Sequence, residues 1–413
     1  MSDRGLMQTD LKNLKESNEF LKLLLDNINS AILIVDENLQ IYQFNNNFHN
    51  LFDRATKRVD NHSFGQITGC VNAVEENKSC GATSQCQLCI LRKSFLQTFL
   101  EDFPIERKRL ERVFYIEGVP ILKYLEFSSR LIQFHGRKMV LAIIYDITEI
   151  EQQKSELERR QTQINIDLEI ASEIQRSLLP HKSIEIKNTL TAWRFEPCHK
   201  VGGDIFQIYI NSDEQIGVYA LDVCGHGVPA AFIAMMISQF LQSLHNRMRQ
   251  TGKLFAPETV MSRLEKEFPM ERFDCFFSIV YATLNIRTGH LVYSNAGHMP
   301  PLILRSNGNL DILEHHGPVI GTGLDSPFGQ KEQKLRQGDR FILYTDGLIE
   351  NFGKNAECKG KNMFYKTLNE LHWQPIKNMV DGVFDHSSTL RGETPPTDDM
   401  SLLAIEYKTW TQK

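Results

Sequence analysis

The stretch from residue 201 to residue 227, VGGDIFQIYINSDEQIGVYALDVCGHG, decides the fold of the C-terminal half of the chain. Two apolar runs rich in Ile, Val and Tyr flank a polar tip at residues 211–214, which is the pattern of an antiparallel hairpin. If the turn centres near Asp213, then Asp204 and Asp222 lie opposite each other, with their Cβ atoms about 4.5–5.5 Å apart. Two carboxylates at that distance repel each other unless a cation lies between them. The hairpin therefore predicts half of a divalent metal site, and the alternative is a pair of solvated turn aspartates.

Acidic residues also stand at the ends of two apolar runs much later in the chain. Asp346 follows the run at residues 340–345, and Asp398 and Asp399 precede the run at residues 400–407. Four predicted strands thus carry carboxylates at their ends, with no His or Cys in the set. An all-oxygen site of this kind suits a hard cation, Mg²⁺ or Mn²⁺.

Six ordered motifs between Gln175 and Tyr407 resemble those of a known family, the metal-dependent protein phosphatases of the type 2C (PPM) fold, in the bacterial branch of the sporulation protein E and sigma-B regulator U phosphatases. The motifs are Gln175-x-x-Leu-Leu-Pro180, Val201-Gly-Gly-Asp204, Asp222-Val-Cys-Gly-His-Gly-Val-Pro-Ala-Ala231, Asn295-Ala-Gly-His-Met-Pro-Pro301, Tyr344-Thr-Asp-Gly-Leu-Ile-Glu350 and Asp398-Asp-Met-Ser401. Carried over residue by residue, the resemblance implies a set of metal ligands. They are Asp204, Asp222, the backbone carbonyl of Val223, Asp346 and Asp398.

The resemblance also implies an α-β-β-α sandwich and two metal ions, Mn²⁺ or Mg²⁺, that activate a water molecule for attack on phosphorus. Asp204 and Asp222 are then the catalytic carboxylates, and we expect Asp222 to bridge the two ions. The implied substrate is the phosphoserine of a regulatory partner protein, typically an anti-sigma-factor antagonist. One position departs from the pattern, because many relatives have an acid where this chain has Gln207. The alternative function is a degenerate phosphatase that acts as a phosphoprotein-binding scaffold, but all four acidic positions are retained.

The bulk composition is that of a soluble multidomain protein. The chain has 413 residues, of which 41% are hydrophobic and 23% are charged, and a formal net charge of −5. This charge argues against a nucleic-acid partner, and the sequence shows neither a run of about 18 apolar residues nor a signal peptide. We therefore expect a cytoplasmic protein with no membrane contact, whose eight cysteines are reduced.

The N-terminal part predicts a sensor. An amphipathic helix is expected within residues 1–28, and residues 29–147 resemble a PAS sensor domain with strands at 113–116, 123–134 and 138–146. The alternative is an unrelated small α+β domain.

Within this domain, Cys70, Cys80, Cys86 and Cys89 form a group whose Cys-x-x-Cys pair has metal-chelating spacing. A Zn²⁺ ion or an iron–sulfur cluster, a reversible disulfide, and inert cysteines are the three interpretations. Cys86-x5-Arg92 also matches the spacing of a thiol phosphatase, but the bulky residues between them exclude a phosphate-wrapping loop.

A helical linker is predicted at residues 148–182, because this segment is dense in Glu, Gln and Arg and contains no Gly or Pro before Pro180. Apolar residues from Ile150 to Leu178 recur at spacings of three and four residues, which is the seam of a coiled coil. Polar residues interrupt this seam at Lys154, Gln161 and Gln175. The seam predicts a homodimer through a parallel coiled coil, and the alternative is a helix packed only on its own domain. The phosphatase domain then occupies residues 183–413.

Four further residues near the motifs are expected to lie outside the site. His226 and His298 stand within motifs but are not ligands in the family pattern. Cys224 has no adjacent base that would make it a nucleophile. Arg194 is near the motifs only in sequence. No histidine-kinase glycine box or diguanylate-cyclase segment is present, since Gly202-Gly-Asp204 lacks the following Glu-Phe.

Overall fold

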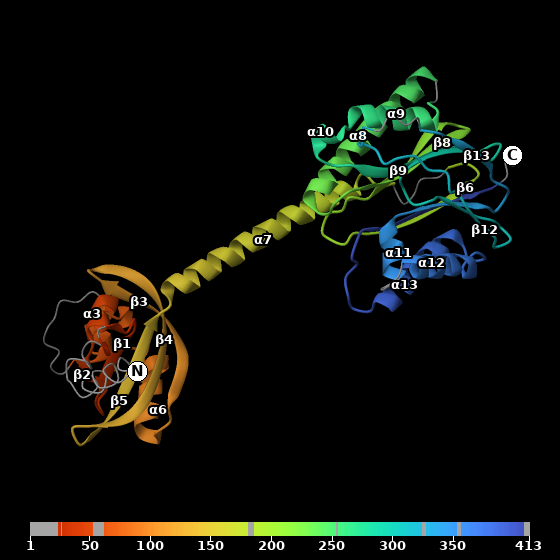
Figure 1. Cartoon of the computed structure of the whole chain (residues 1–413). Helices are drawn as coiled ribbons and strands as arrows, with labels where there is room; N and C mark the ends of the chain where they lie inside the picture. Colours follow the sequence, from red (N-terminus) through yellow and green to blue (C-terminus); the bar gives the residue numbers. More distant parts are fainter. Residues whose placement is uncertain are drawn as a thin grey trace, which may run out of the picture. The chain divides into compact units, whose positions relative to one another are not determined.

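The computed structural model describes residues 24–25, 27–52, 62–180, 186–252, 255–323, 328–352 and 357–408 (Figure 1). The chain divides into two compact units, Met1–Thr162 and Gln163–Lys413, and the boundary falls within a long helix. The amphipathic helix predicted within residues 1–28 lies almost wholly outside the described residues.

The N-terminal unit is a five-stranded antiparallel sheet in the order β2-β1-β5-β4-β3. Its strands are β1 (Ala31–Val35), β2 (Ile41–Phe44), β3 (Ile105–Ile116), β4 (Val119–Phe134) and β5 (Arg137–Asp146). β4 and β5 join through a two-residue turn at His135 and Gly136, both with positive φ, as a tight hairpin of this type requires. β3 begins eight residues before the predicted strand, because a bulge near Arg107 and alternating charged residues mask the apolar pattern there.

Short helices connect β2 to β3 and cover one apolar core. They are α3 (Asn46–Phe52), α4 (Phe64–Ile67), α5 (Val71–Glu75), the 3₁₀ turn η1 (Cys86–Leu88) and α6 (Ile90–Glu101). Four phenylalanines from these helices and β3 meet edge to face in that core: Phe48, Phe52, Phe64 and Phe114. Such edge-to-face contacts add to the apolar burial that holds the helices on the sheet.

The linker helix α7 spans Thr148–Arg176, and the structure describes all of its residues. Asp146 and Thr148 form its entry, since the Asp146 carboxylate accepts a hydrogen bond from the Thr148 backbone N–H at 2.9 Å. The helix ends four residues before Pro180, because Ser177 and Leu178 already form a turn.

The C-terminal unit stacks two five-stranded antiparallel sheets face to face. One sheet has the order β13-β10-β9-β8-β7 and the other β12-β11-β14-β15-β6. The strands of the first are β7 (Ile205–Ser212), β8 (Gln215–Val223), β9 (Phe277–Asn285), β10 (His290–Ala296) and β13 (Lys331–Lys334); those of the second are β6 (Thr189–Glu196), β11 (Leu302–Leu304), β12 (Leu310–Ile312), β14 (Arg340–Tyr344) and β15 (Met400–Tyr407). The inner faces share one apolar core, to which Val218 and Ile279 contribute from one sheet and Phe341 and Leu403 from the other.

Helices cover both outer faces, which gives the predicted α-β-β-α order (Figure 1). α8 (Val228–Thr251), α9 (Pro257–Glu267) and α10 (Met270–Phe273) lie on the side of the first sheet, and α11 (Asp346–Phe352), α12 (Glu357–Glu370) and α13 (Ile376–Arg391) on the side of the second. Among the described residues, α8 is the one helix long and apolar enough to cross a membrane. It instead packs on β7 and β8 and buries Ala234, Ile237 and Leu241 in the domain core.

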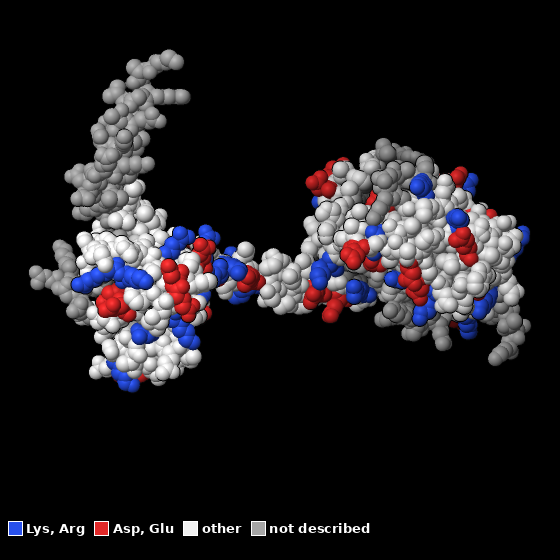
Figure 2. Space-filling view, turned by 90° about the horizontal axis from the view of Figure 1, so that it is seen from below, with Lys and Arg blue, Asp and Glu red and all other residues white. Residues whose placement is uncertain are grey.

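On the face shown in Figure 2, Lys and Arg side chains of the described residues alternate with Asp and Glu. This interspersed pattern is that of a solvated surface with both signs of charge.

Candidate active site

The metal ligands predicted from the sequence lie together where the two sheets meet. The register of the first hairpin pairs Ile205 with Leu221, so Asp204, one residue before β7, continues that register opposite Asp222. The turn falls at residues 213–214, as predicted. From the second sheet come Asp346, the first residue of α11 directly after β14, and Asp398, two residues before β15. Asp346 thus begins a helix, whereas the sequence placed it at a strand end.

These carboxylates raise one another's pKa. Burial, followed by the charges of Asp222 and Asp399, holds the pKa of Asp204 well above its usual range. Burial, followed by Asp346 and Asp398, raises the pKa of Asp222 to about 7. Burial, followed by Asp398, raises that of Asp346 to about 6. Negative charge is therefore concentrated at this site. No Lys, Arg or His side chain is among the causes of these three pKa shifts.

Asp204 carries a buried carboxylate oxygen without a hydrogen-bond partner. Its side chain is 2% exposed, and the unpartnered atom is Oδ2. An unpaired buried carboxylate oxygen costs several kcal/mol unless it is neutralised or coordinates a cation. Three of the other carboxylates line one cavity of about 300 Å³ together with Val223 and His298; they are those of Asp222, Asp346 and Asp398. The residues present therefore fit hard divalent cations, held by Asp204, Asp222, Asp346, Asp398 and the carbonyl of Val223.

Asp399 holds the loop that presents Asp204, a role that the sequence did not reveal. Its carboxylate accepts hydrogen bonds from the backbone N–H groups of Cys198 at 2.9 Å and Gly203 at 2.6 Å. A side chain at Gly202 would overlap this carboxylate, and a Cβ at Gly203 would lie 2.9 Å from the Val223 carbonyl oxygen. The two glycines are therefore required by close approach. Two features of the sequence could have indicated this role of Asp399. One is the pair of glycines beside Asp204, and the other is the pair of adjacent acids Asp398-Asp399.

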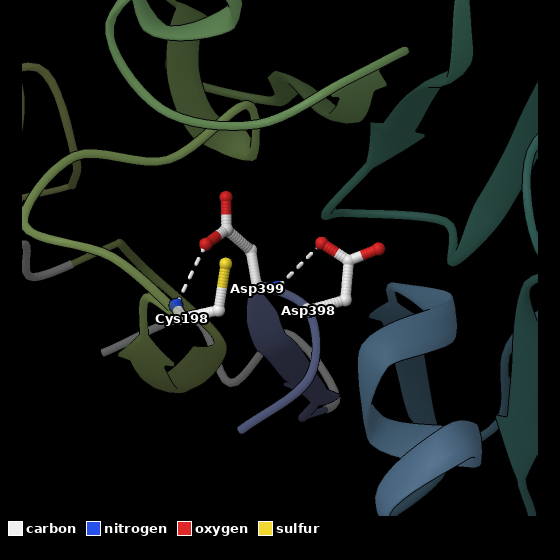
Figure 3. A group of neighbouring side chains, drawn as sticks. All are labelled: Cys198, Asp398 and Asp399. Carbon is white, nitrogen blue, oxygen red and sulfur yellow. Dashed lines mark hydrogen bonds between the residues drawn. The ribbon is translucent and has the colours of Figure 1, made fainter. Parts of the chain in front are cut away.

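Cys198 lies beside Asp398 and Asp399, and single ligand atoms of the three fall within 4.8 Å of one another (Figure 3). Figure 3 shows the Asp399 carboxylate engaged by the Cys198 backbone, while that of Asp398 accepts a hydrogen bond from the Asp399 N–H. Burial, followed by the charges of Asp399 and Asp398, raises the pKa of the Cys198 thiol to about 12. Cys198 is therefore a neutral thiol at physiological pH and is unsuited to act as a nucleophile.

The two motif histidines occupy different positions. His298 is 6% exposed, its Nδ1 lies 2.8 Å from the Ser278 hydroxyl, and burial lowers its pKa to about 3. The His298 imidazole is therefore neutral. The Asn295 side-chain amide donates to the His298 carbonyl and accepts from the His298 N–H, as expected for a structural turn. His226 is exposed and its ring lies 4.9 Å from that of His199.

Glu350 also belongs to the electrostatic surroundings of the site, since its charge contributes to the raised pKa values of Asp222 and Asp346. Its position four residues after Asp346, on the same helix face, was the signal that could have identified it. Arg194, in contrast, lies 3.1 Å from Asp385 on α13 and lines a separate cavity, so it remains outside the site.

The end of α7 is fixed to the hairpin that carries Asp204. The Gln175 amide donates to the Gly202 carbonyl at 2.6 Å and accepts from the Gly202 N–H at 3.1 Å. The Gln207 amide donates to the Leu178 carbonyl at 2.7 Å, which a carboxylate at this position could not do. Gln175 is 2% exposed, so it anchors the helix within this domain rather than weakening a coiled-coil seam as the sequence suggested.

The four cysteines of the N-terminal unit also come together. Cys70, Cys80, Cys86 and Cys89 line one cavity, although among the described residues no three of their sulfur atoms lie within 4.8 Å of one another. Residues 86–92 form η1 and the first turn of α6, so the loop that a thiol phosphatase requires does not exist there.

Two facing antiparallel sheets covered by helices, with carboxylates from both sheets at one end, are the features of the PP2C fold. A solved structure described as the SiaA-PP2C domain of Pseudomonas aeruginosa has this fold, with a TM-score of 0.52 and 20% identity; the match covers 60% of this chain and 99% of that one.

The family described as Stage II sporulation protein E (SpoIIE) matches residues 212–408, a segment that includes Asp222, Asp346 and Asp398. This segment of the C-terminal unit is therefore similar to the SpoIIE family. Phosphoserine phosphatase RsbU of Bacillus subtilis (strain 168) is 26% identical over 296 residues, which are 70% of this chain and 84% of that protein. Phosphoserine phosphatase RsbP of the same organism is 25% identical over 247 residues, which are 59% of this chain and 58% of that protein.

Proposed function

We propose that the chain is a metal-dependent protein phosphatase that hydrolyses a phosphoserine on a regulatory partner protein, under the control of its N-terminal unit. The buried, unpartnered Oδ2 of Asp204 carries the metal-dependent part of this proposal, because a cation would satisfy it and would also relieve the repulsion among the neighbouring carboxylates. Phosphoserine as the substrate rests on the names of the two relatives. An anti-sigma-factor antagonist is the partner that the family resemblance suggests.

The chain's own residues supply the remaining parts of the reaction. Asp204, Asp222, Asp346 and Asp398 would hold two ions, Mn²⁺ or Mg²⁺, with the Val223 carbonyl as a neutral ligand. When bound, such ions supply Lewis acidity, which lowers the pKa of a water molecule and stabilises charge on phosphoryl oxygens. Asp399 keeps Asp204 in position through its backbone hydrogen bonds. The neutral His298 borders the same cavity without adding charge.

The direct test is hydrolysis of an aryl phosphate and of a phosphoserine peptide by the full chain, with and without Mn²⁺. We expect both to be hydrolysed only with the metal, and added EDTA to abolish turnover. The scaffold alternative predicts tight binding of the phosphopeptide without release of inorganic phosphate. Binding without turnover at saturating Mn²⁺ and Mg²⁺ would reject the enzymatic proposal.

The control of this activity is proposed to run through α7 in a homodimer. Ile150, Leu157 and Ile164, spaced by seven residues, are between 52% and 67% exposed in the single chain, as expected of a seam that a second helix covers. At the other end of α7, the Gln175 side chain makes two hydrogen bonds with the backbone of Gly202. Gly202 lies two residues before Asp204. A shift of the paired helices would therefore move Gly202 through the hydrogen bonds of Gln175, and with it the neighbouring metal ligand Asp204.

The linker proposal is tested by Leu157→Asp combined with Ile164→Asp in the full chain. We expect the mass per particle in light scattering to halve and the regulated activity to change. Gln152→Asp combined with Arg159→Asp, on the outer face of the same helix, is the matched control and should leave both unchanged. Equal mass and activity in all three proteins would refute the coiled-coil switch while leaving the phosphatase proposal intact.

A further inference from the structure

The N-terminal unit contains a cavity on which four thiols converge from separate segments. Cys70 stands at the start of α5, Cys80 in the loop that follows it, Cys86 in η1 and Cys89 at the start of α6. All four are free thiols. We propose that these four cysteines ligate an iron–sulfur cluster. The proposal concerns the N-terminal unit alone and does not depend on the proposed phosphatase activity.

The backbone around the cavity is shaped to the sulfur atoms. A Cβ at Gly65 would lie 2.9 Å from the Cys80 Sγ and 3.3 Å from the Cys70 Cβ, so only glycine leaves room for both cysteines. The Cys86 Sγ accepts a hydrogen bond from the Gly81 N–H at 3.1 Å. Close glycine backbone and N–H donors directed at sulfur are features of cluster-binding loops, where they stabilise the thiolate form of the ligands.

Further observations distinguish the thiols from ordinary core cysteines. The Thr83 hydroxyl lies 2.9 Å from the Cys86 Sγ. Although burial raises the pKa of the Cys86 thiol, the hydrogen bonds from Thr83 and Gly81 outweigh it and lower that pKa. Burial raises the pKa of the Cys80 thiol, a hydrogen bond with the Gly65 backbone opposes this, and the charges of the other three cysteines raise it further. An inert core cysteine has no need of such donors.

The spacing of the sulfur atoms favours a cluster over a single zinc ion. Four thiolates at about 2.3 Å from one Zn²⁺ place their sulfurs roughly 3.8 Å apart. Within the part of the chain that the structure describes, no three of these sulfurs are mutually within 4.8 Å; the only group that meets this limit is Cys198, Asp398 and Asp399 in the other unit. The four cysteines instead line one common cavity. Sulfurs that face one space without meeting at one point suit a cluster, whose iron atoms each take their own thiolate ligand, better than a single ion.

The rest of the lining suits an anionic, water-sensitive cluster. Arg92 and Arg112 line the cavity and supply positive charge near the thiolates. The Arg92 guanidinium lies within about 3 Å of where a Cβ on Gly81 would be, directly beside the loop that bonds Cys86. Phe64, Phe95 and Phe114 form the apolar wall, which limits access of water to the sulfurs. Charge balance and restricted solvent are both properties that tune protein-bound clusters.

The test uses the full chain purified without air and, separately, the chelator-treated chain reconstituted with ferrous iron and sulfide. We expect iron and acid-labile sulfide in equal amounts, two or four of each per chain, with a visible charge-transfer absorption. Cys86→Ala and the isosteric Cys89→Ser should each lower both contents about tenfold while the far-ultraviolet circular dichroism is kept. Cys224→Ser and Asp222→Asn, in the other unit, are the matched controls and should retain both.

Three outcomes would overturn the proposal. One zinc per chain without sulfide identifies a mononuclear site. A disulfide among the four cysteines in air-free, metal-free protein, detected by mass spectrometry, identifies a thiol switch. Iron that survives in both cysteine variants and is lost in Asp222→Asn belongs to the phosphatase domain.

Discussion

The carboxylate site of the C-terminal unit and the thiol cavity of the N-terminal unit each gather four ligand-type side chains, but they do so at different electrostatic cost. The carboxylates are ionised in water and raise one another's pKa when they are brought together. The thiol cavity instead has cationic side chains in its lining, because Arg92 and Arg112 border it beside the four cysteines.

The difference also appears in how each site is built. Asp204 and Asp222 are placed by the register of a hairpin, and Asp346 and Asp398 by the ends of β14 and β15. The cysteines stand in loops and at the starts of short helices. The carboxylates are thus held by two packed sheets, whereas the cysteines are held by short connecting segments.

The largest effect is expected for a substitution at Asp222, because its charge contributes to metal binding. Asp222→Asn removes one of the charges that hold the cations, so we expect Mn²⁺-dependent turnover of an aryl phosphate to fall by about 10²–10³-fold. Asp213→Asn, at the exposed turn of the same hairpin, is the matched control and should retain full activity. Near-normal turnover of Asp222→Asn at saturating Mn²⁺ would show that the carboxylates are not the metal site.

The second prediction concerns stability in the absence of metal. The pKa of Asp222 is about 7 in the folded protein against 3.8 ordinarily, so folding favours its protonated form. Its contribution to stability is therefore fully present below pH 4 and is lost as the pH rises through 7. We expect metal-free Asp222→Asn to be more stable than the metal-free wild type by roughly 2–4 kcal/mol at pH 8, and by little at pH 4.5.

Urea unfolding followed by tryptophan fluorescence measures this difference in one domain, because the three tryptophans, Trp193, Trp373 and Trp410, all lie in the C-terminal unit. Comparison of two proteins at each pH cancels the titration of His298 and other shared groups. A stability difference that does not change between pH 4.5 and pH 8 would contradict the repulsion attributed to these carboxylates.

The sequence predicted those parts of the fold that local patterns specify. The polar tip of the first hairpin fixes its turn, and the turn fixes the pairing of Asp204 with Asp222. The sandwich order and the four acidic positions followed from the motifs. Asp346 was misplaced by one element, because its strand and the helix α11 are separated only by Thr345.

The rest depends on contacts between segments far apart in the chain. Asp399 binds the backbone of Cys198, some 201 residues away, and Gln175 binds Gly202, 27 residues away. No periodicity encodes such pairs. Gln175 was predicted as a polar interruption of a seam, because spacing alone cannot distinguish a residue that faces a second helix from one that faces its own domain.

The third prediction concerns the two hydrogen bonds between Gln175 and Gly202. Gln175→Ala leaves the Gly202 N–H and carbonyl without their buried partner, which costs roughly 1–3 kcal/mol. We expect the free energy of unfolding of the C-terminal unit to fall by this amount and the apparent Mn²⁺ affinity, read from activity, to fall about tenfold, since the loop also carries Asp204. Gln152→Ala, exposed on the same helix, should change neither quantity. A purely structural role would lower stability and leave the Mn²⁺ dependence as it was.

The smallest effect is expected at the thiol cavity, where the substitution removes a single weak hydrogen bond. Thr83 is buried and its hydroxyl contacts the Cys86 sulfur, so Thr83→Val removes one weak hydrogen bond at nearly constant volume. We expect the N-terminal unit to lose about 0.5–1.5 kcal/mol of stability, measured by circular dichroism. Ser84→Ala is the matched control, because the Ser84 hydroxyl bonds Glu76 at the exposed surface and not a sulfur.

The same pair of variants compares the two kinds of site directly. If the cavity only packs neutral thiols, Thr83→Val lowers stability and has no other consequence. If it holds thiolates, loss of the donor raises the pKa of Cys86, so retention of iron during mild chelation should fall in Thr83→Val and remain at the wild-type level in Ser84→Ala. Equal retention in both variants would show that the contact to Cys86 serves packing alone, and that the thiol cavity differs from the carboxylate site in having no ligand-dependent polar shell.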